Sequence, residues 1–367
     1  MGIYCKICLK EENKNILHKT IRLKRNEALK SLNSVIQCLF HIEPFVNYIK
    51  SKFYEINKRD IYNKFKASGK CLTDPLKNLL DELFPEKFEK TEDYEMKTKS
   101  ESISTEDLSK MIYTINSKYN EKQDDLISFI LSRLHAELNK TENINQTVLI
   151  TGSNDKQKAF INFFDNFKKE NKSIISDMFY GIYYSKYTCN NCGNNLYKFK
   201  NYIHRLYTLS QVYNYRYQAI ESGTNNISEI NIYDCLFYDK SINECQKECE
   251  KCHSPTTNEQ KIIYTSPNIL IFIINRNDID LKFKFLIEEN INISDFVEKQ
   301  KNRRYELIGI IYNFDENRFK AYCKNYGNKQ WTGYEDENIL FSGDFQDIKN
   351  IEKNAKPYIL FYQINNK

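Results

Sequence analysis

The pattern of apolar positions predicts a core helix near the start of the chain. Between Ser31 and Pro44 the apolar residues recur at helical spacing, at Leu32, Val35, Ile36, Leu39 and Phe40. We expect this helix to begin near Ser31 and to end before Pro44, because a proline disfavours helical backbone in the residue before it. One face of the helix is therefore buried.

Further amphipathic patterns predict helices over 50–84 and over Asp124–Leu138. In the first of these, Thr73 or Asp74 is a candidate N-cap before a proline. The stretch 150–172 is also predicted to be a helical connection. The first half of the chain is therefore mainly helical.

Between these helices the stretch 86–122 is charged and poor in large apolar residues. We expect a flexible insertion that holds a short helix starting near Ser104.

The second half of the chain favours strands. A continuous apolar run, Asn268–Ile274, is typical of a buried central strand, and Ser266 and Pro267 separate it from the strand before it. A second apolar segment, Tyr305–Tyr312, is predicted to be another inner strand. Helices followed by strands predict an α+β fold.

Composition limits the class of protein. The chain has 367 residues and 41% hydrophobic residues, enough for one large domain with subdomains or for two domains. The net charge of +5 is mild and basic residues alternate with acidic ones, so no nucleic-acid partner is expected. The sequence shows no N-terminal signal pattern and no long apolar run, so neither secretion nor a membrane span is expected.

Cysteine usage points to thiol or metal chemistry. The 11 cysteines are an odd number in a chain without an export signal, so we expect an intracellular protein of the cytoplasm or nucleus rather than a disulfide framework. Two Cys-x-x-Cys pairs stand out, Cys189 with Cys192 and Cys249 with Cys252. Four thiolates from two such pairs form a closed, structural Zn²⁺ site, and the alternative is four unmetallated buried thiols.

A third pair, Cys5 and Cys8, lies near His18 at the N-terminus. This ligand set is incomplete for zinc. It is either a remnant of a larger zinc module or two ordinary thiols.

Several segments resemble the ubiquitin-specific proteases, the papain-like deubiquitinases. The segment Asn33–Ile42 resembles the first box of that family, and the helix that ends at Leu138 resembles the second. The resemblance runs from about Ile21 to Tyr362 and continues through segments that match the family's order, at Ser173–Gly193, Asn268–Ile274, Asn317–Lys324, Trp331–Asp336 and Tyr358–Tyr362.

The resemblance implies a papain-like cysteine protease fold for 21–367, after an N-terminal extension at 1–20. In that fold a helical thumb covers about 21–172, zinc-bearing β fingers about 173–265, and an antiparallel β palm about 266–367.

The same resemblance places the catalytic positions on unsuitable residues. The nucleophilic cysteine maps to Lys30, the base to Arg318, and the oxyanion-stabilising asparagine to Arg25. The group that orients the base maps to Glu335, followed by Asp336. A lysine places a cation where a helix N-terminus would stabilise a thiolate, and an arginine does not give up its proton.

A relocated set of catalytic residues is not evident. No histidine follows His253, in the part of the chain that supplies the base, and neither Cys38 nor Cys323 has an evident base. We therefore expect no catalytic residue. Our hypothesis is that Lys30, Arg318, Glu335 and Asp336 form a salt-bridged cluster that closes the former cleft.

An acid at one binding position is retained. The resemblance implies that Asp125 faces the arginine-bearing tail of ubiquitin. The alternative is that Asp124 and Asp125 only favour the start of a helix.

Three functions stay in competition. The first is an inactive pseudo-deubiquitinase that binds ubiquitin or a ubiquitinated protein, or serves as a scaffold in a larger complex. The second is an active, thiol-dependent deubiquitinase with relocated catalytic residues. The third is a zinc-stapled structural protein that retains only the fold.

Overall fold

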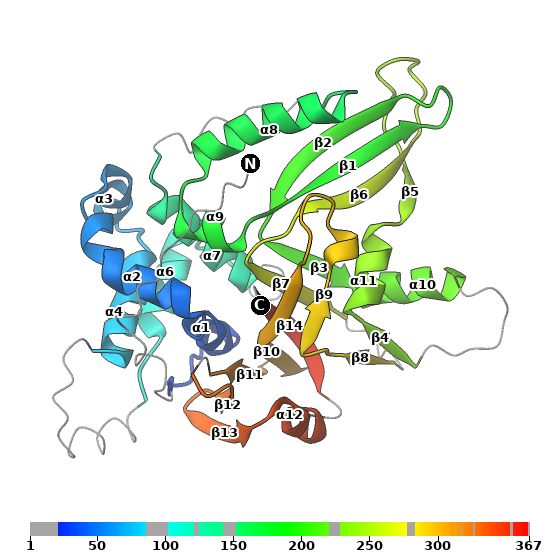
Figure 1. Cartoon of the computed structure of the whole chain (residues 1–367). Coiled ribbons are helices and arrows are strands. Elements are labelled where there is room, and N and C mark those ends of the chain that lie inside the picture. Colours follow the sequence, from blue (N-terminus) through cyan, green and yellow to red (C-terminus); the bar gives the residue numbers. More distant parts are fainter. Residues whose placement is uncertain are drawn as a thin grey trace.

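The computed structural model describes residues 21–85, 102–120, 125–141, 152–219, 228–276, 283–315, 317–325, 327–352 and 355–365. The extension 1–20 with Cys5, Cys8 and His18 lies outside the described residues, as does the part 86–101 of the predicted insertion. Figure 1 shows a helical part on one side of a large sheet and a smaller sheet that projects from the same side of the molecule as α8.

The helical part corresponds to the expected thumb and its connection to the fingers. Its helices are α1 (Leu32–Phe40), α2 (Glu43–Ile56), α3 (Asp60–Ala67), α4 (Thr73–Leu83), α6 (Glu106–Ile115), α7 (Leu126–Leu138), α8 (Lys156–Glu170) and α9 (Ile174–Phe179). The prediction for the first helix is confirmed, since α1 starts after Ser31 and ends before Pro44, which lies in the first turn of α2. The short helix expected near Ser104 is α6.

The start of α4 differs from the prediction by one residue, because a distant carboxylate caps it. The N-cap is Leu72, not Thr73 or Asp74. Glu137 on α7 accepts the backbone N–H groups of Leu72 and Thr73, each at 2.8 Å, and Arg133 donates to the same carboxylate at 2.6 Å. The Glu137 side chain is fully buried, so these bonds hold α7 against the start of α4.

The large sheet is the expected palm. Its order is β13-β12-β11-β10-β14-β7-β3, and β9 also pairs with β10. All neighbours are antiparallel except β3 and β7. The strands are β3 (His204–Thr208), β7 (Ile269–Asn275), β9 (Asn290–Asn292), β10 (Arg304–Asp315), β11 (Arg318–Lys324), β12 (Trp331–Glu335), β13 (Asn338–Gly343) and β14 (Lys356–Ile364).

Both inner-strand predictions are confirmed. The run Asn268–Ile274 is β7, buried along nearly its whole length, and Tyr305–Tyr312 lies within β10 at the centre of the sheet.

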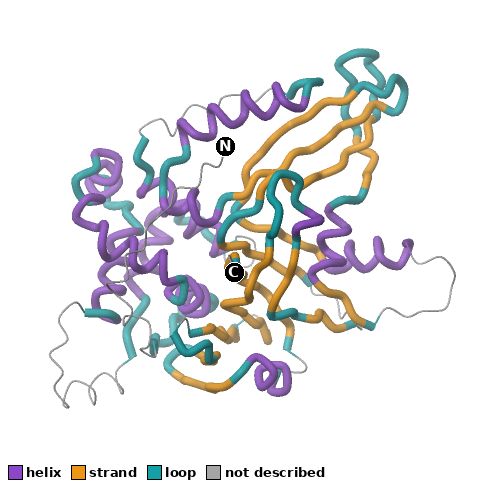
Figure 2. The backbone as a smooth tube through the Cα atoms, viewed as in Figure 1, coloured by secondary structure: helices purple, strands orange, loops and turns teal. Residues whose placement is uncertain are grey.

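The palm sheet has a different cover on each face. Ile271, Ile311 and Phe361 pack into one core with the thumb helices. Phe272 and Tyr362 point the other way, into a second core. Apolar residues of α10 (Leu209–Ala219), α11 (Ile232–Asp239) and α12 (Phe345–Ile351) close this second core. Figure 2 marks the helices and the strands along the backbone.

The smaller sheet forms the expected fingers. It consists of β1 (Gly181–Cys189), β2 (Asn195–Tyr202), β5 (Ile242–Cys245) and β6 (Thr257–Thr265), in the order β2-β1-β6-β5. Helix α8 runs beside β2 (Figure 1) and packs aromatic side chains onto the sheet. A separate two-stranded sheet pairs β4 (Glu229–Asn231) with β8 (Lys284–Leu286), and a 3₁₀ turn spans Ser294–Phe296.

The segment between the two cysteine pairs is less rich in strands than its sequence indicated. Within the predicted fingers range 173–265, the chain returns to the palm as β3 and then forms α10 and α11. Tyr213, Tyr215 and Tyr217 alternate along α10, a period and a residue type that are typical of strands. Packing onto the palm overrides this local preference.

No helix in the described part of the chain combines the length and the apolar character that crossing a membrane requires.

The cap at Glu137 yields a stability prediction. We expect Glu137→Ala to lower the free energy of unfolding by about 3 kcal/mol, because it leaves two buried N–H groups and the Arg133 guanidinium without their partner. Urea denaturation measures this loss. The control is Glu55→Ala, since Glu55 makes only an exposed ion pair with Lys52 and its loss should cost about 0.5 kcal/mol or less. Equal effects of the two substitutions would contradict the capping role.

Candidate functional site

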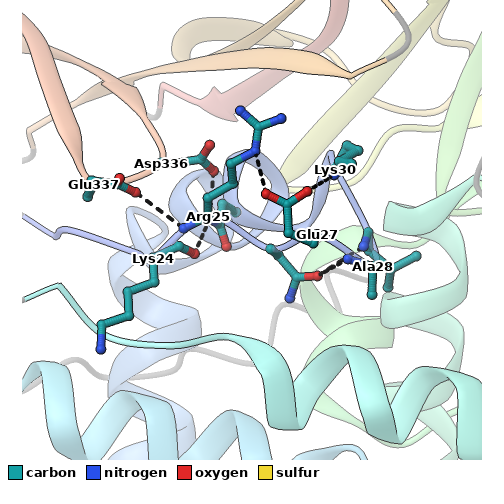
Figure 3. A network of polar contacts seen from close by, with 10 residues as sticks. Lys24, Arg25, Glu27, Ala28, Lys30, Asp336 and Glu337 are labelled. Carbon is teal, nitrogen blue, oxygen red and sulfur yellow. Dashed lines mark hydrogen bonds and ion pairs between the residues drawn. The ribbon is translucent and has the colours of Figure 1, made fainter.

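The position expected for a nucleophile holds an ion-paired lysine. Lys30 lies two residues before α1, and its ammonium bonds to the carboxylate of Glu27. The same carboxylate pairs with Arg25 at 3.0 Å, so it joins the nucleophile and oxyanion positions (Figure 3). A hydrogen bond from Lys30 and the charges of both cations lower the pKa of Glu27. The carboxylate is therefore ionised at neutral pH and is shared by the two cations.

The positions of the base and its orienting acid also form an ion pair. The Arg318 guanidinium donates to both carboxylate oxygens of Glu335, at 2.6 and 3.2 Å. This contact is the one that our salt-bridge hypothesis predicts between those two residues. Lys30, in contrast, pairs with Glu27, a carboxylate that the sequence analysis did not consider.

Asn33 connects the thumb to the palm at this site. Its amide group donates to the Lys24 carbonyl at 2.8 Å and to Asp336 Oδ1 at 2.7 Å, and its Oδ1 accepts the Thr105 hydroxyl at 2.7 Å. Burial raises the pKa of Asp336, while the bond from Asn33 opposes that rise. Three segments far apart in the sequence thus meet at one buried side chain.

Asn26 is a site residue that the sequence analysis missed. Its side-chain oxygen accepts the backbone N–H groups of Ala28 and Leu29, at 3.1 and 2.9 Å, and its amide donates to Thr105 at 3.1 Å. The sequence offered only an uncharged polar residue between Arg25 and Glu27, which indicated nothing by itself. Because Asn26 binds these N–H groups, they do not stabilise an oxyanion there.

The described residues contain no cysteine thiol hydrogen-bonded to a histidine. Cys38 and Cys323 face each other with their Sγ atoms 3.8 Å apart, and burial raises the pKa of Cys323 well above its usual value. The nearby imidazole of His41 faces the Gln37 carbonyl at 2.7 Å and the Tyr334 hydroxyl at 3.4 Å. Burial lowers the pKa of His41 to about 4, so it is neutral at neutral pH.

Asp125 lies where α7 of the thumb meets β3 of the palm. It is the N-cap residue of α7, but its side chain makes no capping hydrogen bond. Its Oδ2 instead accepts the Ser128 hydroxyl at 2.6 Å, and His204 on β3 lies beside both residues.

The four predicted zinc ligands converge at the tip of the fingers. The Sγ atoms of Cys189, Cys192, Cys249 and Cys252 all lie within 4.8 Å of one another. Two cross-knuckle pairs are 3.5 and 3.7 Å apart. A tetrahedron with Zn–S bonds of about 2.3 Å has edges of about 3.8 Å, so the thiols fit zinc.

The surrounding backbone supports the same arrangement. The N–H of Asn191 points to Cys189 Sγ at 3.4 Å, and that of Lys251 points to Cys249 Sγ at 3.4 Å. Gly193 closes the first knuckle at a φ of 67°, in the left-handed region that glycine favours. His253 bonds to Glu248 at 2.6 Å and lies outside the cluster of four cysteines.

A comparison with protein families decides the family. The family described as ubiquitin carboxyl-terminal hydrolase matches residues 30–362. The chain belongs to this family.

Individual members of the family resemble this chain over shorter segments. Ubiquitin carboxyl-terminal hydrolase 32 from Mus musculus and from Homo sapiens is 25% identical to it over 167 residues. That alignment covers 44% of this chain and only 10% of the relatives' length.

Solved structures in the family share the fold. A yeast SAGA DUB module with mutant Sgf73 aligns with a TM-score of 0.64 and 17% identity, over 96% of this chain and 70% of that one. The SAGA Ubp8/Sgf11/Sus1/Sgf73 DUB module bound to ubiquitin aldehyde aligns with a TM-score of 0.62 and 17% identity, over 96% and 71%. The predicted α+β ubiquitin-specific protease fold is confirmed.

The contacts of Asn33 and Arg318 predict losses of stability of different size. We expect Asn33→Ala to cost about 2 kcal/mol, because it removes one buried and two partly buried hydrogen bonds to three segments of the chain. Arg318→Ala should cost about 0.5 kcal/mol or less, since 52% of the arginine side chain is exposed. Urea denaturation of both variants measures the difference, and a larger loss for Arg318→Ala would contradict this account.

The cysteine cluster predicts a metal content. We expect about one zinc per chain in the purified protein and almost none in Cys192→Ser, with a lower melting temperature. Elemental analysis measures the metal. Cys245→Ser is the matched control, because Cys245 contacts Thr257 and lies outside the cluster. Zinc retained by Cys192→Ser, or absent from the unchanged protein, would contradict the site.

Proposed function

We propose that this chain is a ubiquitin-specific protease fold that binds ubiquitin without cleaving it. The observation that carries the proposal is the pairing of the former catalytic positions, Lys30 with Glu27 and Arg318 with Glu335. Their side chains satisfy one another in place of a thiol and an imidazole. A zinc ion at the four finger cysteines would hold the fingers together and supply no chemistry.

Acyl transfer needs a nucleophile, a base within reach and a group that stabilises the oxyanion. At the family's positions these roles fall on Lys30, Arg318 and Arg25. If Lys30 attacked an isopeptide as an amine, it would leave a stable amide and not turn over. Loss of all three roles together supports a protein that has no hydrolase activity.

The electrostatics of the site are compatible with a cationic partner. Arg25, Lys30 and Arg318 supply three positive charges. The Glu27 carboxylate pairs with Arg25 and Lys30, and that of Glu335 pairs with Arg318. Two further acids lie close by: Glu337 accepts the backbone N–H of Arg25, and Asp336 accepts the amide of Asn33. Each of the three cations therefore has a carboxylate beside it, which weakens its repulsion of the arginine-bearing tail of ubiquitin.

Relatives support ubiquitin and protein complexes as the class of partner. A solved structure with this fold is bound to ubiquitin aldehyde and contains the subunits Sgf11, Sus1 and Sgf73. We infer by this likeness that the chain binds ubiquitin or a ubiquitinated protein, with Asp125 contacting the ubiquitin tail, and that it works within a larger complex. An active enzyme with relocated residues is the competing function.

The test combines calorimetry with a reactive ubiquitin. We expect the unchanged protein to bind ubiquitin and to form no covalent adduct with a ubiquitin that carries a C-terminal electrophile. An adduct with the unchanged protein would support the competing function.

The variant Lys30→Cys separates failure to react from failure to bind. It returns a thiol to the start of α1, where the helix N-terminus favours a thiolate. We expect it to form the adduct at this cysteine, read by mass spectrometry. Binding by neither protein and no adduct with Lys30→Cys would overturn ubiquitin as the partner.

A further inference from the structure

An acid, a hydroxyl and an imidazole meet where α7 contacts β3. Ser128 Oγ lies 2.6 Å from Asp125 Oδ2 and 2.6 Å from His204 Nδ1. His204 Nε2 is 3.7 Å from the same carboxylate oxygen. Each of the Asp125 and His204 side chains is 25% exposed, so this group lies at the edge of the surface.

The hydrogen bonds fix where the protons lie. An ionised carboxylate only accepts, so the single hydroxyl proton of Ser128 points to Asp125. His204 Nδ1 must then donate its N–H to Ser128 Oγ. A neutral imidazole in this tautomer leaves Nε2 bare, facing Asp125. Protonation of Nε2 would turn that contact into an ion pair.

Burial keeps the His204 imidazole neutral near pH 7. Burial lowers its pKa, Asp125 opposes that shift, and the neighbouring Arg205 adds to it. Arg205 points to the other face of β3, where it pairs with Asp239 at 2.6 Å. While His204 is neutral, no imidazolium competes for the Asp125 carboxylate; once His204 is protonated, its imidazolium does.

An exposed apolar side chain lies on the same strand as His204. His204 and Leu206 pair with Ile271 and Ile273 on β7, so they point toward the same, thumb-facing side of the sheet. Leu206 is 56% exposed. In the described part of the chain, Asp125 Oδ1 is a buried oxygen that has no hydrogen-bond partner. An acid beside an apolar side chain suits an extended polypeptide that carries basic and apolar residues.

We propose that Ser128 and His204 are positioning residues that make docking of a basic polypeptide tail at Asp125 depend on pH. With His204 neutral, Asp125 is free to pair with a cation of the tail. With His204 protonated, the imidazolium takes that place and the tail is released. This inference rests on the proposed function for the identity of the tail, which is that of ubiquitin.

The first test measures ubiquitin binding by calorimetry at about pH 7.5 and about pH 5, a range that reaches well below the usual histidine pKa because burial lowers that of His204. We expect the dissociation constant for the unchanged protein to be about three- to fivefold larger at the acid pH, which is the effect of one partly exposed charge pair. His204→Asn should bind equally at both. His253→Asn is the control, since His253 lies in the fingers, and it should behave like the unchanged protein. If binding by His204→Asn depended on pH as strongly as binding by the unchanged protein, the proposed role of His204 would be overturned.

A second test needs no ubiquitin. Proton NMR of the imidazole ring gives the pKa of His204 in the unchanged protein and in Asp125→Asn. We expect a lower pKa in the variant, because the carboxylate that favours the imidazolium is gone. Equal values would overturn the coupling whatever the ligand. Coupling without ubiquitin binding at either pH would overturn the proposed function and the tail assigned here.

Discussion

The buried hydrogen bonds of Asn33 hold together the parts of this protein that its function depends on. One side chain joins the segment before α1, the end of β12 and the segment that leads into α6. Because Asn33 is buried, each of these bonds replaces one to water, and losing it would leave a polar group without a partner. The thumb and palm are thus fixed relative to each other with no contribution from a catalytic residue.

This arrangement is compatible with a fold that has no catalytic groups, as we propose. The cations at Lys30 and Arg318 lie at the edge of the thumb–palm junction and are matched by Glu27 and Glu335. One partner of each ion pair is more than half exposed, and such pairs contribute little to stability. The fold is instead stabilised by the two apolar cores on either side of the palm and by buried polar bonds such as those at Glu137.

Local patterns in the sequence predicted much of this structure. The periodic helix after Ser31, the apolar strand at Asn268–Ile274 and the convergence of four cysteines each depend on neighbours in sequence or on a known ligand geometry. What the sequence did not predict depends on distant partners. The cap of α4 comes from Glu137, 65 residues beyond Leu72 in the chain, and no local pattern indicates it.

The candidate site likewise contains residues that the sequence identified and contacts that it could not predict. The resemblance identified Lys30 and Arg318, but not the carboxylate that Lys30 contacts. Glu27 and Asn26 lie in a loop without periodicity, and their roles appear only when the loop folds against α1 and Thr105. The grouping of Asp125 with His204 requires α7 and β3 to meet, which depends on the whole thumb–palm interface.

The central claim is that the fold persists without hydrolysis, and isopeptide cleavage tests it most directly. The measurement is the release of monoubiquitin from isopeptide-linked diubiquitin by the zinc-loaded protein at high concentration, with and without a thiol-alkylating reagent. The account predicts no release above the rate without protein. Release that the reagent abolishes would contradict it, because a cysteine outside the family's position would then be the nucleophile.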